Sequence, residues 1–153
     1  MTGPKLIRTR RHLPHWDLPG STYFVTFRVY RGRMAESEQQ LVLDHLVAGD
    51  EKFYRLVAAV VMPDHAHLIF RPRDGYTLSR VMKGIKGVSA KQVNEARGTQ
   101  GTFWQDEYHD RILRSEDEMF EKARYLLENP HRAGLVEPGC QSPFVTNNLP
   151  REA

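Results

Sequence analysis

The chain has 153 residues, of which 40% are hydrophobic and 27% charged, and its formal net charge is +3. This length and composition predict a single soluble globular domain over residues 1–153, and no apolar run approaches the roughly 20 residues of a membrane span, so we expect a cytoplasmic protein. The single cysteine, Cys140, excludes an internal disulfide and a zinc site built from several cysteines.

The charged residues are unevenly distributed, although the net charge is small. Lysines and arginines dominate residues 5–33, where Asp17 is the only acid, and residues 71–97, where Asp74 and Glu95 are the only acids. Clustered cations of this kind indicate a polyanionic ligand, most often nucleic acid. A basic solvated surface without a ligand is the alternative for each block.

Four elements are predicted in the first half of the chain. The hydrophobic patterns favour a strand over residues 20–32, a short helix over 37–47, and strands over 54–62 and 65–71. Pro63 and Asp64 form a turn pair between the last two apolar runs, so these runs are expected to make an antiparallel hairpin.

The second half predicts two helices and one strand before a tail. A long helix with an apolar stripe is expected over residues 77–96, a short strand over 111–114, and a helix over 116–128 that ends before Asn129 and Pro130. The tail from about residue 137 is expected to be irregular. The resulting order, βαββαβ, predicts an α+β fold with a ferredoxin-like antiparallel sheet, helices on one face and an additional C-terminal helix.

Two histidines interrupt the apolar run of residues 60–70, "VVMPDHAHLIF". Side chains alternate between the two faces of a strand, so His65 and His67 leave it on the same side. Paired imidazoles suit a shared metal ion or phosphate. Alone they are also compatible with structural zinc, with a pair of core histidines, or with a metallohydrolase that takes further ligands such as His109 or Asp110.

The last predicted helix carries a tyrosine on its polar side. Tyr125 lies opposite the apolar stripe, and Asn129 follows it by four residues, one helical turn along the same side. A phenol is a reluctant nucleophile at neutral pH because its pKa is near 10. It becomes useful against a phosphodiester if a divalent cation withdraws charge from the phosphate, and two imidazoles and an amide oxygen could supply three ligands to that cation. A surface tyrosine without a catalytic role is the alternative.

The chain resembles the REP-associated tyrosine transposases, which belong to the single-tyrosine HUH transposase group. The resemblance rests on "VVMPDHAHLIF", "FWQDEYHDRILRSEDEM" and "RYLLENPHRAGLV" in this order, and it extends over about residues 8–136. It implies that His65 and His67 bind Mg²⁺ or Mn²⁺, that Tyr125 is the nucleophile, and that Asn129 completes the metal site. The implied activity is cleavage and rejoining of single-stranded DNA at repetitive palindromic elements through a 5′-phosphotyrosine.

Further residues are candidates for contacts with the single-stranded or hairpin DNA that the resemblance implies. They are Arg10, Arg11, Lys83 and Lys86 for the DNA backbone, and Trp104 and Gln105 as family signature residues. Packing is the alternative for Trp104, and Tyr108 is a rival nucleophile. Relatives in the wider group act as dimers, so a homodimer and a monomer both stay open. A catalytically idle DNA-binding protein and a metal-dependent hydrolase that uses bound water are the alternative functions.

Overall fold

A five-stranded antiparallel sheet forms the centre of the molecule. The computed structural model describes residues 7–8, 16–17 and 20–149, and the strand order in the sheet is β6-β3-β5-β4-β7. The strands are β3 (Thr22–Arg28), β4 (Tyr54–Val61), β5 (His65–Pro72), β6 (His109–Leu113) and β7 (Val145–Asn147). Two further two-residue strands, β1 (Ile7–Arg8) and β2 (Trp16–Asp17), pair with each other. The α+β architecture predicted from the sequence is confirmed.

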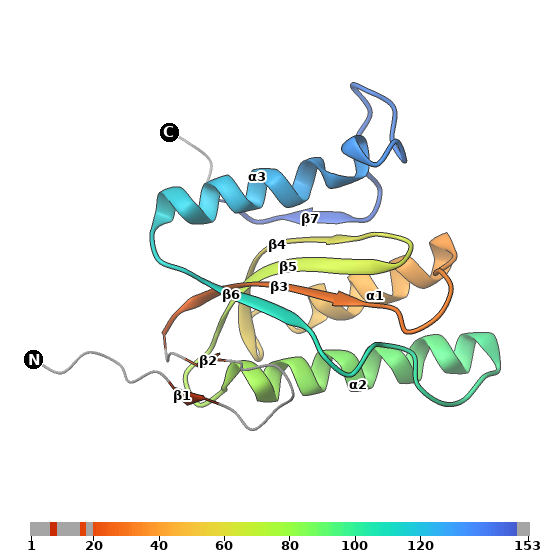
Figure 1. Ribbon diagram of the computed structural model, residues 1–153, viewed down its shortest axis with the longest axis horizontal. Helices are drawn as coiled ribbons and strands as arrows, with labels where there is room; N and C mark the ends of the chain where they lie inside the picture. The colour runs from red at the N-terminus through yellow and green to blue at the C-terminus, as the bar shows by residue number, and fades with distance from the viewer. Residues whose placement is uncertain (1–6, 9–15, 18–19, 150–153) are drawn as a thin grey trace, which may run out of the picture.

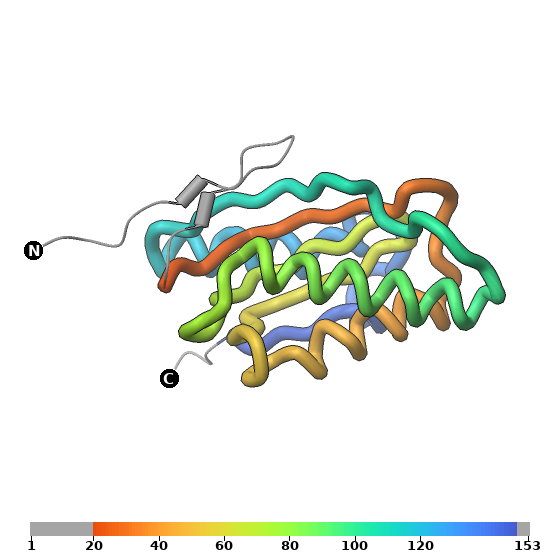
Figure 2. Tube along the Cα trace, turned by 90° about the horizontal axis from the view of Figure 1, so that it is seen from below, coloured from red at the N-terminus to blue at the C-terminus, as the bar shows by residue number. Residues whose placement is uncertain are grey.

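Helices cover both faces of this sheet. On one face lie α1 (Glu36–Ala48) and α2 (Leu78–Arg97), and on the other lies α3 (Glu116–Arg132), as Figure 1 shows. Figure 2, turned to look from below, shows α1 and α2 in front of the sheet. The two-residue period of β5 explains this arrangement, because Leu68 and Phe70 join the core under α1 and α2 while Ile69 joins a second core under α3. The face that bears Ile69 is also the face of the two histidines.

The last helix is longer than its sequence predicted. It was expected to end before Asn129 and Pro130, but it continues to Arg132 with Pro130 inside it. A proline removes only one helical hydrogen bond, and the bonds on either side of it persist. After the proline, the Ala133 amide donates to the Asn129 carbonyl at 3.0 Å and the Leu135 amide donates to the Pro130 carbonyl at 2.9 Å; the Arg132 guanidinium also donates to the Tyr125 carbonyl at 2.6 Å. Because Pro130 is also buried, packing holds the last turn in place, and Asn129 lies within the helix.

The tail after α3 returns to the sheet. Residues 145–147 form β7, a three-residue strand that pairs with the outer edge of β4, in a region that was expected to be irregular. Val145 and Leu149 pack against the core under α3. The tail therefore covers one edge of the sheet. Within the described part of the chain, no helix combines the length and the apolar character that crossing a membrane requires.

A nearly buried ion pair ties α1 to α2. Glu38 in the first turn of α1 is 8% exposed, and its carboxylate accepts hydrogen bonds from the Arg97 guanidinium and, at 2.7 Å, from the Ala35 amide. The hydrogen bonds from Arg97 lower the pKa of Glu38, although burial opposes the shift. The carboxylate is therefore charged at neutral pH and joins the start of one helix to the end of the other.

Candidate active site

The two histidines meet at the beginning of β5, on the face of the sheet that α3 covers. Their Nε2 atoms lie 3.1 Å apart, and their rings are 4.7 Å apart at an interplanar angle of 76°. In the sheet, His65 pairs with Arg28 and His67 pairs with Thr26. The strand register therefore positions both imidazoles beside the end of β3.

Each imidazole has its second nitrogen occupied by a neighbouring side chain. Nδ1 of His67 lies 2.7 Å from Oγ1 of Thr26, and Nδ1 of His65 lies 2.7 Å from Oδ1 of Asp64. When each Nδ1–H donates to these oxygens, each Nε2 presents its lone pair to the space between the rings. This is the arrangement in which a histidine binds a metal, because the partner at Nδ1 fixes the tautomer and the orientation of the ring.

Burial and the surrounding charges favour a neutral His67 and a negative Asp64. Burial, together with the nearby charges of His65, Arg28 and Arg132, lowers the pKa of His67 to about 3. Burial raises the pKa of Asp64, but the hydrogen bond from His65 and the charges of His65 and Arg28 outweigh it and lower the pKa overall. At neutral pH His67 therefore keeps a free lone pair, which a cation requires of its ligand.

A third donor reaches the pair from α3. The Nδ2 atom of the Asn129 side-chain amide lies 3.5 Å from Nε2 of His65. Rotation of the amide group by half a turn exchanges nitrogen and oxygen, so the same position can offer Oδ1 to a cation. Two ligand atoms that are each about 2.1 Å from a metal ion, with a ligand–metal–ligand angle of about 90°, lie about 3 Å from each other. The two Nε2 atoms have about this separation, 3.1 Å. The donor set therefore fits one small divalent cation.

The other ligands considered for a metallohydrolase do not join this group. His109 lies on β6 opposite Thr26 and is exposed. Over the described residues, no cluster of three or more His, Cys, Asp or Glu side chains could hold a metal ion, so neither His109 nor Asp110 completes a site with the paired histidines. The third protein ligand available to the pair is the Asn129 amide.

Tyr125 lies one helical turn before Asn129 on the exposed side of α3. Its side chain is 51% exposed, and the Arg132 guanidinium lies 4.1 Å from the centre of its ring. Among the described residues, none forms a hydrogen bond with its hydroxyl group. The structure therefore brings His65, His67 and Asn129 together, and places Tyr125 on the adjoining turn in contact with Arg132.

The remaining predicted DNA contacts have different environments. Lys83 is exposed on α2, whereas the Lys86 ammonium group donates to the carbonyls of Gln105 and Asp106 at 2.6 and 2.7 Å. The side chain of Gln105 is exposed, and its backbone N–H donates to the backbone carbonyl of Arg28, next to the site. Lys83 and Gln105 thus present free surface, while Lys86 fastens the loop before β6 to α2. Arg10 and Arg11 lie outside the described residues.

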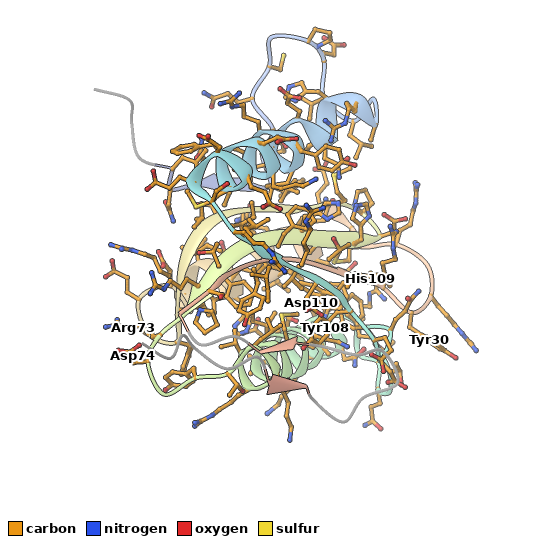
Figure 3. All side chains as sticks on the ribbon, turned by 60° about the vertical axis from the view of Figure 1, so that its left-hand side comes forward. Tyr30, Arg73, Asp74, Tyr108, His109 and Asp110 are labelled. Atoms are coloured by element: carbon orange, nitrogen blue, oxygen red, sulfur yellow. The ribbon has the colours of Figure 1, made fainter. Side chains whose placement is uncertain are left out.

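Two aromatic candidates are core residues. Trp104 is 3% exposed, its indole N–H donates to the Ser89 hydroxyl at 2.9 Å, and its ring packs edge-on against Phe27. A buried indole cannot stack on a base, so the predicted DNA contact of Trp104 is replaced by a packing role. The rival nucleophile Tyr108, on the stretch leading into β6 (Figure 3), is fully buried and has no access to a DNA strand.

Sequence reasoning missed four residues beside the site. Asp64 and Thr26 hold the two histidines, and the charges of Arg28 and Arg132 act on His67. Asp64 directly precedes His65 in the sequence, so its carboxylate could have been suggested as a partner. Thr26 is separated from His67 by 41 residues, and only the pairing register of β3 and β5 brings the two side chains together.

Comparison with known proteins places this geometry in a family context. Residues 21–125 match the family described as "Transposase IS200 like". The structure of the REP-associated tyrosine transposase bound to a REP hairpin superposes with a TM-score of 0.65 at 21% identity, over 83% of this chain and 76% of that one. A proposed transposase from Deinococcus radiodurans R1 is 22% identical over 80% of this chain and 97% of its own, but its TM-score of 0.48 is too low to carry an argument. No curated protein matches.

Proposed function

The chain belongs to the IS200-like transposase family, and from this membership we propose that it cleaves and rejoins single-stranded DNA through a 5′-phosphotyrosine at Tyr125. The observation that carries the proposal is the meeting of three donors from two distant segments. Nε2 of His65 lies 3.1 Å from Nε2 of His67 and 3.5 Å from the side-chain amide of Asn129, and Tyr125 lies on the preceding turn of the same helix as Asn129. The family match includes both histidines and Tyr125.

His65, His67 and Asn129 would hold the divalent cation, Mg²⁺ or Mn²⁺. When bound, such an ion withdraws charge from the non-bridging oxygens of a phosphodiester. Thr26 and Asp64 keep the two imidazoles in the binding orientation. Two cations of the chain, Arg28 and Arg132, add positive charge beside the histidines, which favours the approach of a phosphate.

Tyr125 supplies the nucleophile. In the proposed reaction its side chain leaves the Arg132 guanidinium and turns toward the phosphate held beside Asn129. The phenol oxygen forms a bond to phosphorus as the bond to the 3′ oxygen of the preceding nucleotide breaks, and the phenol proton passes through solvent to that oxygen. A 3′ hydroxyl group later attacks the phosphotyrosine, which restores a phosphodiester and frees Tyr125. The ester conserves the bond energy, so rejoining needs no further cofactor.

The proposed substrate is single-stranded DNA next to a palindromic hairpin. The neighbour of similar fold is a REP-associated tyrosine transposase bound to a REP hairpin, which supports this class of DNA for the present chain. The exposed Lys83 and Gln105 belong to the proposed DNA surface. A protein with this substrate is proposed to act in the cytoplasm of a bacterial cell, where the DNA lies.

The test is a covalent adduct on denaturing gels. The protein is incubated with end-labelled palindromic single-stranded DNA and Mn²⁺, and we expect a labelled protein band that Tyr125→Phe abolishes and that Tyr108→Phe retains. Binding without cleavage would support an idle DNA-binding protein instead. Cleavage without an adduct, undiminished in Tyr125→Phe, would support hydrolysis by bound water and contradict the proposal.

A further inference from the structure

An exposed aromatic side chain lies just beyond the proposed active site. The ladder between β3 and β5 ends where Arg28 pairs with His65, and the chain continues through Val29 to Tyr30. Val29 faces the core with 6% exposure, whereas Tyr30 is 51% exposed. Two residues of extended chain span about 7 Å, so Tyr30 lies about that distance beyond the strand position paired with His65.

The backbone at this point is fixed to its neighbours. The Val29 amide donates to the carbonyl of Asp64 at 2.9 Å, and the Tyr30 amide donates to the carbonyl of Phe103 at 2.8 Å. These bonds tie Tyr30 both to the turn that precedes the histidines and to the loop before β6. Tyr30 is therefore an exposed ring on a firmly held backbone, and its position relative to the histidines is set by the fold.

A cation accompanies the ring. The Arg31 guanidinium lies 5.1 Å from the centre of the Tyr30 ring, which is within the range of a cation–π contact. Figure 3 shows Tyr30 projecting outward, at the opposite side of the molecule from Arg73 and Asp74. A cation on one side of an exposed ring leaves its other side open to a second flat, electron-rich partner.

The geometry points to a base-stacking site, and we propose that Tyr30, backed by Arg31, stacks on an unpaired base next to the phosphate that is cut. The charges favour nucleic acid over a protein partner, because Arg28, Arg31 and Arg33 follow one another without an acid until Glu36. Interleaved aromatic and cationic side chains are the pattern of surfaces that bind single strands. This inference rests on the proposed function and extends it to a second contact.

The distance between Tyr30 and the histidines limits how far along the strand the stacked base can lie from the phosphate that is cut. A stacked strand advances about 3.4 Å per nucleotide, so about 7 Å corresponds to two nucleotides. The base that meets Tyr30 therefore lies within about two nucleotides of the phosphate at the histidines. Because every base presents a flat face, the contact is tolerant of sequence, and it orients the strand rather than reading it.

The experiment measures binding of oligothymidine with and without its bases. Fluorescence anisotropy is recorded with labelled oligothymidine in EDTA, so that metal-dependent cleavage plays no part, and again with an abasic strand of equal length. Tyr30→Ala is expected to weaken oligothymidine binding by about 5- to 150-fold, the range found for one stacked base. Binding of the abasic strand should stay at the wild-type level, and Tyr30→Phe, which keeps the ring, should retain most of the affinity.

Phe53 offers a matched control at the far end of the sheet. Its ring is 45% exposed, and its carbonyl accepts a hydrogen bond from the amide of Arg73, at the opposite side of the molecule from Tyr30. Phe53→Ala should leave oligothymidine binding unchanged. Unchanged melting temperatures of the variants would show that folding is intact.

The outcomes separate this inference from the proposed function. Wild-type affinity of Tyr30→Ala for oligothymidine, or an equal loss for the abasic strand, overturns the stacking site and leaves the reaction at Tyr125 standing. Base-dependent loss in Tyr30→Ala without any adduct at Tyr125 supports stacking and overturns the reaction. If the wild-type protein binds neither strand, the stacking site is overturned, and the adduct at Tyr125 with palindromic DNA still tests the reaction by itself.

Discussion

Thr26 is expected to control the affinity of the histidine pair for a metal ion, although it does not contact the ion itself. Replacement of Thr26 by Val keeps the shape of the side chain and removes the oxygen that lies 2.7 Å from Nδ1 of His67. Loss of a partner of this kind lowers metal affinity by about 10- to 100-fold, which corresponds to about 1.4 to 2.7 kcal/mol.

The structure favours the upper end of that range. Thr26 is 8% exposed and His67 is 9% exposed, so water cannot take the place of the lost hydroxyl group. A buried donor without a partner costs about 1 to 3 kcal/mol, which agrees with the estimate from metal affinity. The bond from His65 to Asp64 differs, because the Asp64 side chain is 49% exposed. Water can replace that carboxylate, so Asp64→Ala should reduce Mn²⁺ affinity by about tenfold, at the lower end of the range.

The assay is calorimetric titration of the full chain with Mn²⁺ in the absence of DNA. Thr26→Ser, which restores the hydroxyl group, should recover most of the affinity. Thr22→Val is the matched control, because Thr22 lies on the same strand four residues away, opposite Leu113 rather than a histidine. Wild-type Mn²⁺ affinity in Thr26→Val, or an equal loss in Thr22→Val, would refute the role assigned to Thr26.

Three further predictions concern the helices and the loop before β6. Replacement of Glu38 by Gln should lower the free energy of unfolding by about 2 kcal/mol at pH 7, measured with urea. Arg97 lowers the pKa of Glu38 below its ordinary value of 4.5 in the folded protein, so this stabilisation is fully present above pH 4.5. It is lost as the pH falls through the pKa of Glu38 in the folded protein, and the unfolding free energies of variant and wild type should therefore converge in acid. Lys83→Ala should reduce the slope of log affinity for DNA against log salt by about one, and Lys86→Ala should reduce it less, because the Lys86 ammonium group is bound to two carbonyls. Trp104→Phe should destabilise the fold by about 1 to 3 kcal/mol through its lost indole hydrogen bond, yet leave DNA affinity unchanged.

Local periodicity was enough to predict the three helices and the strands β3 to β6, but not β1, β2 or β7. The alternation of β5 correctly placed His65 and His67 on one side of the strand, and the helical spacing placed Asn129 one turn after Tyr125. Neither pattern depends on distant parts of the chain. The helix boundary was wrong because a local rule about Pro130 was overridden by the packing of the buried Pro130 and by the helical hydrogen bond that follows it, from Ala133 to Asn129.

What the sequence could not supply was the pairing of distant segments. An apolar stripe predicts that α3 packs on something, but it does not say which face of the sheet receives it. That choice places Asn129 beside His65 across 64 residues of sequence. The same limit applies to Thr26, because its bond to His67 depends on strand register. It also applies to Trp104, because an aromatic residue after a glycine-rich loop is compatible with both packing and DNA contact until its burial is known.

The central claim is that the phenol of Tyr125 becomes joined to DNA next to the metal site of His65, His67 and Asn129. Mass spectrometry of the trapped and digested adduct tests it most directly. The account predicts that the nucleotide mass lies on the peptide containing Tyr125, in a 5′ linkage, and that His67→Ala removes it. A nucleotide on any other residue, or free 5′-phosphate ends with no modified peptide, would contradict the account.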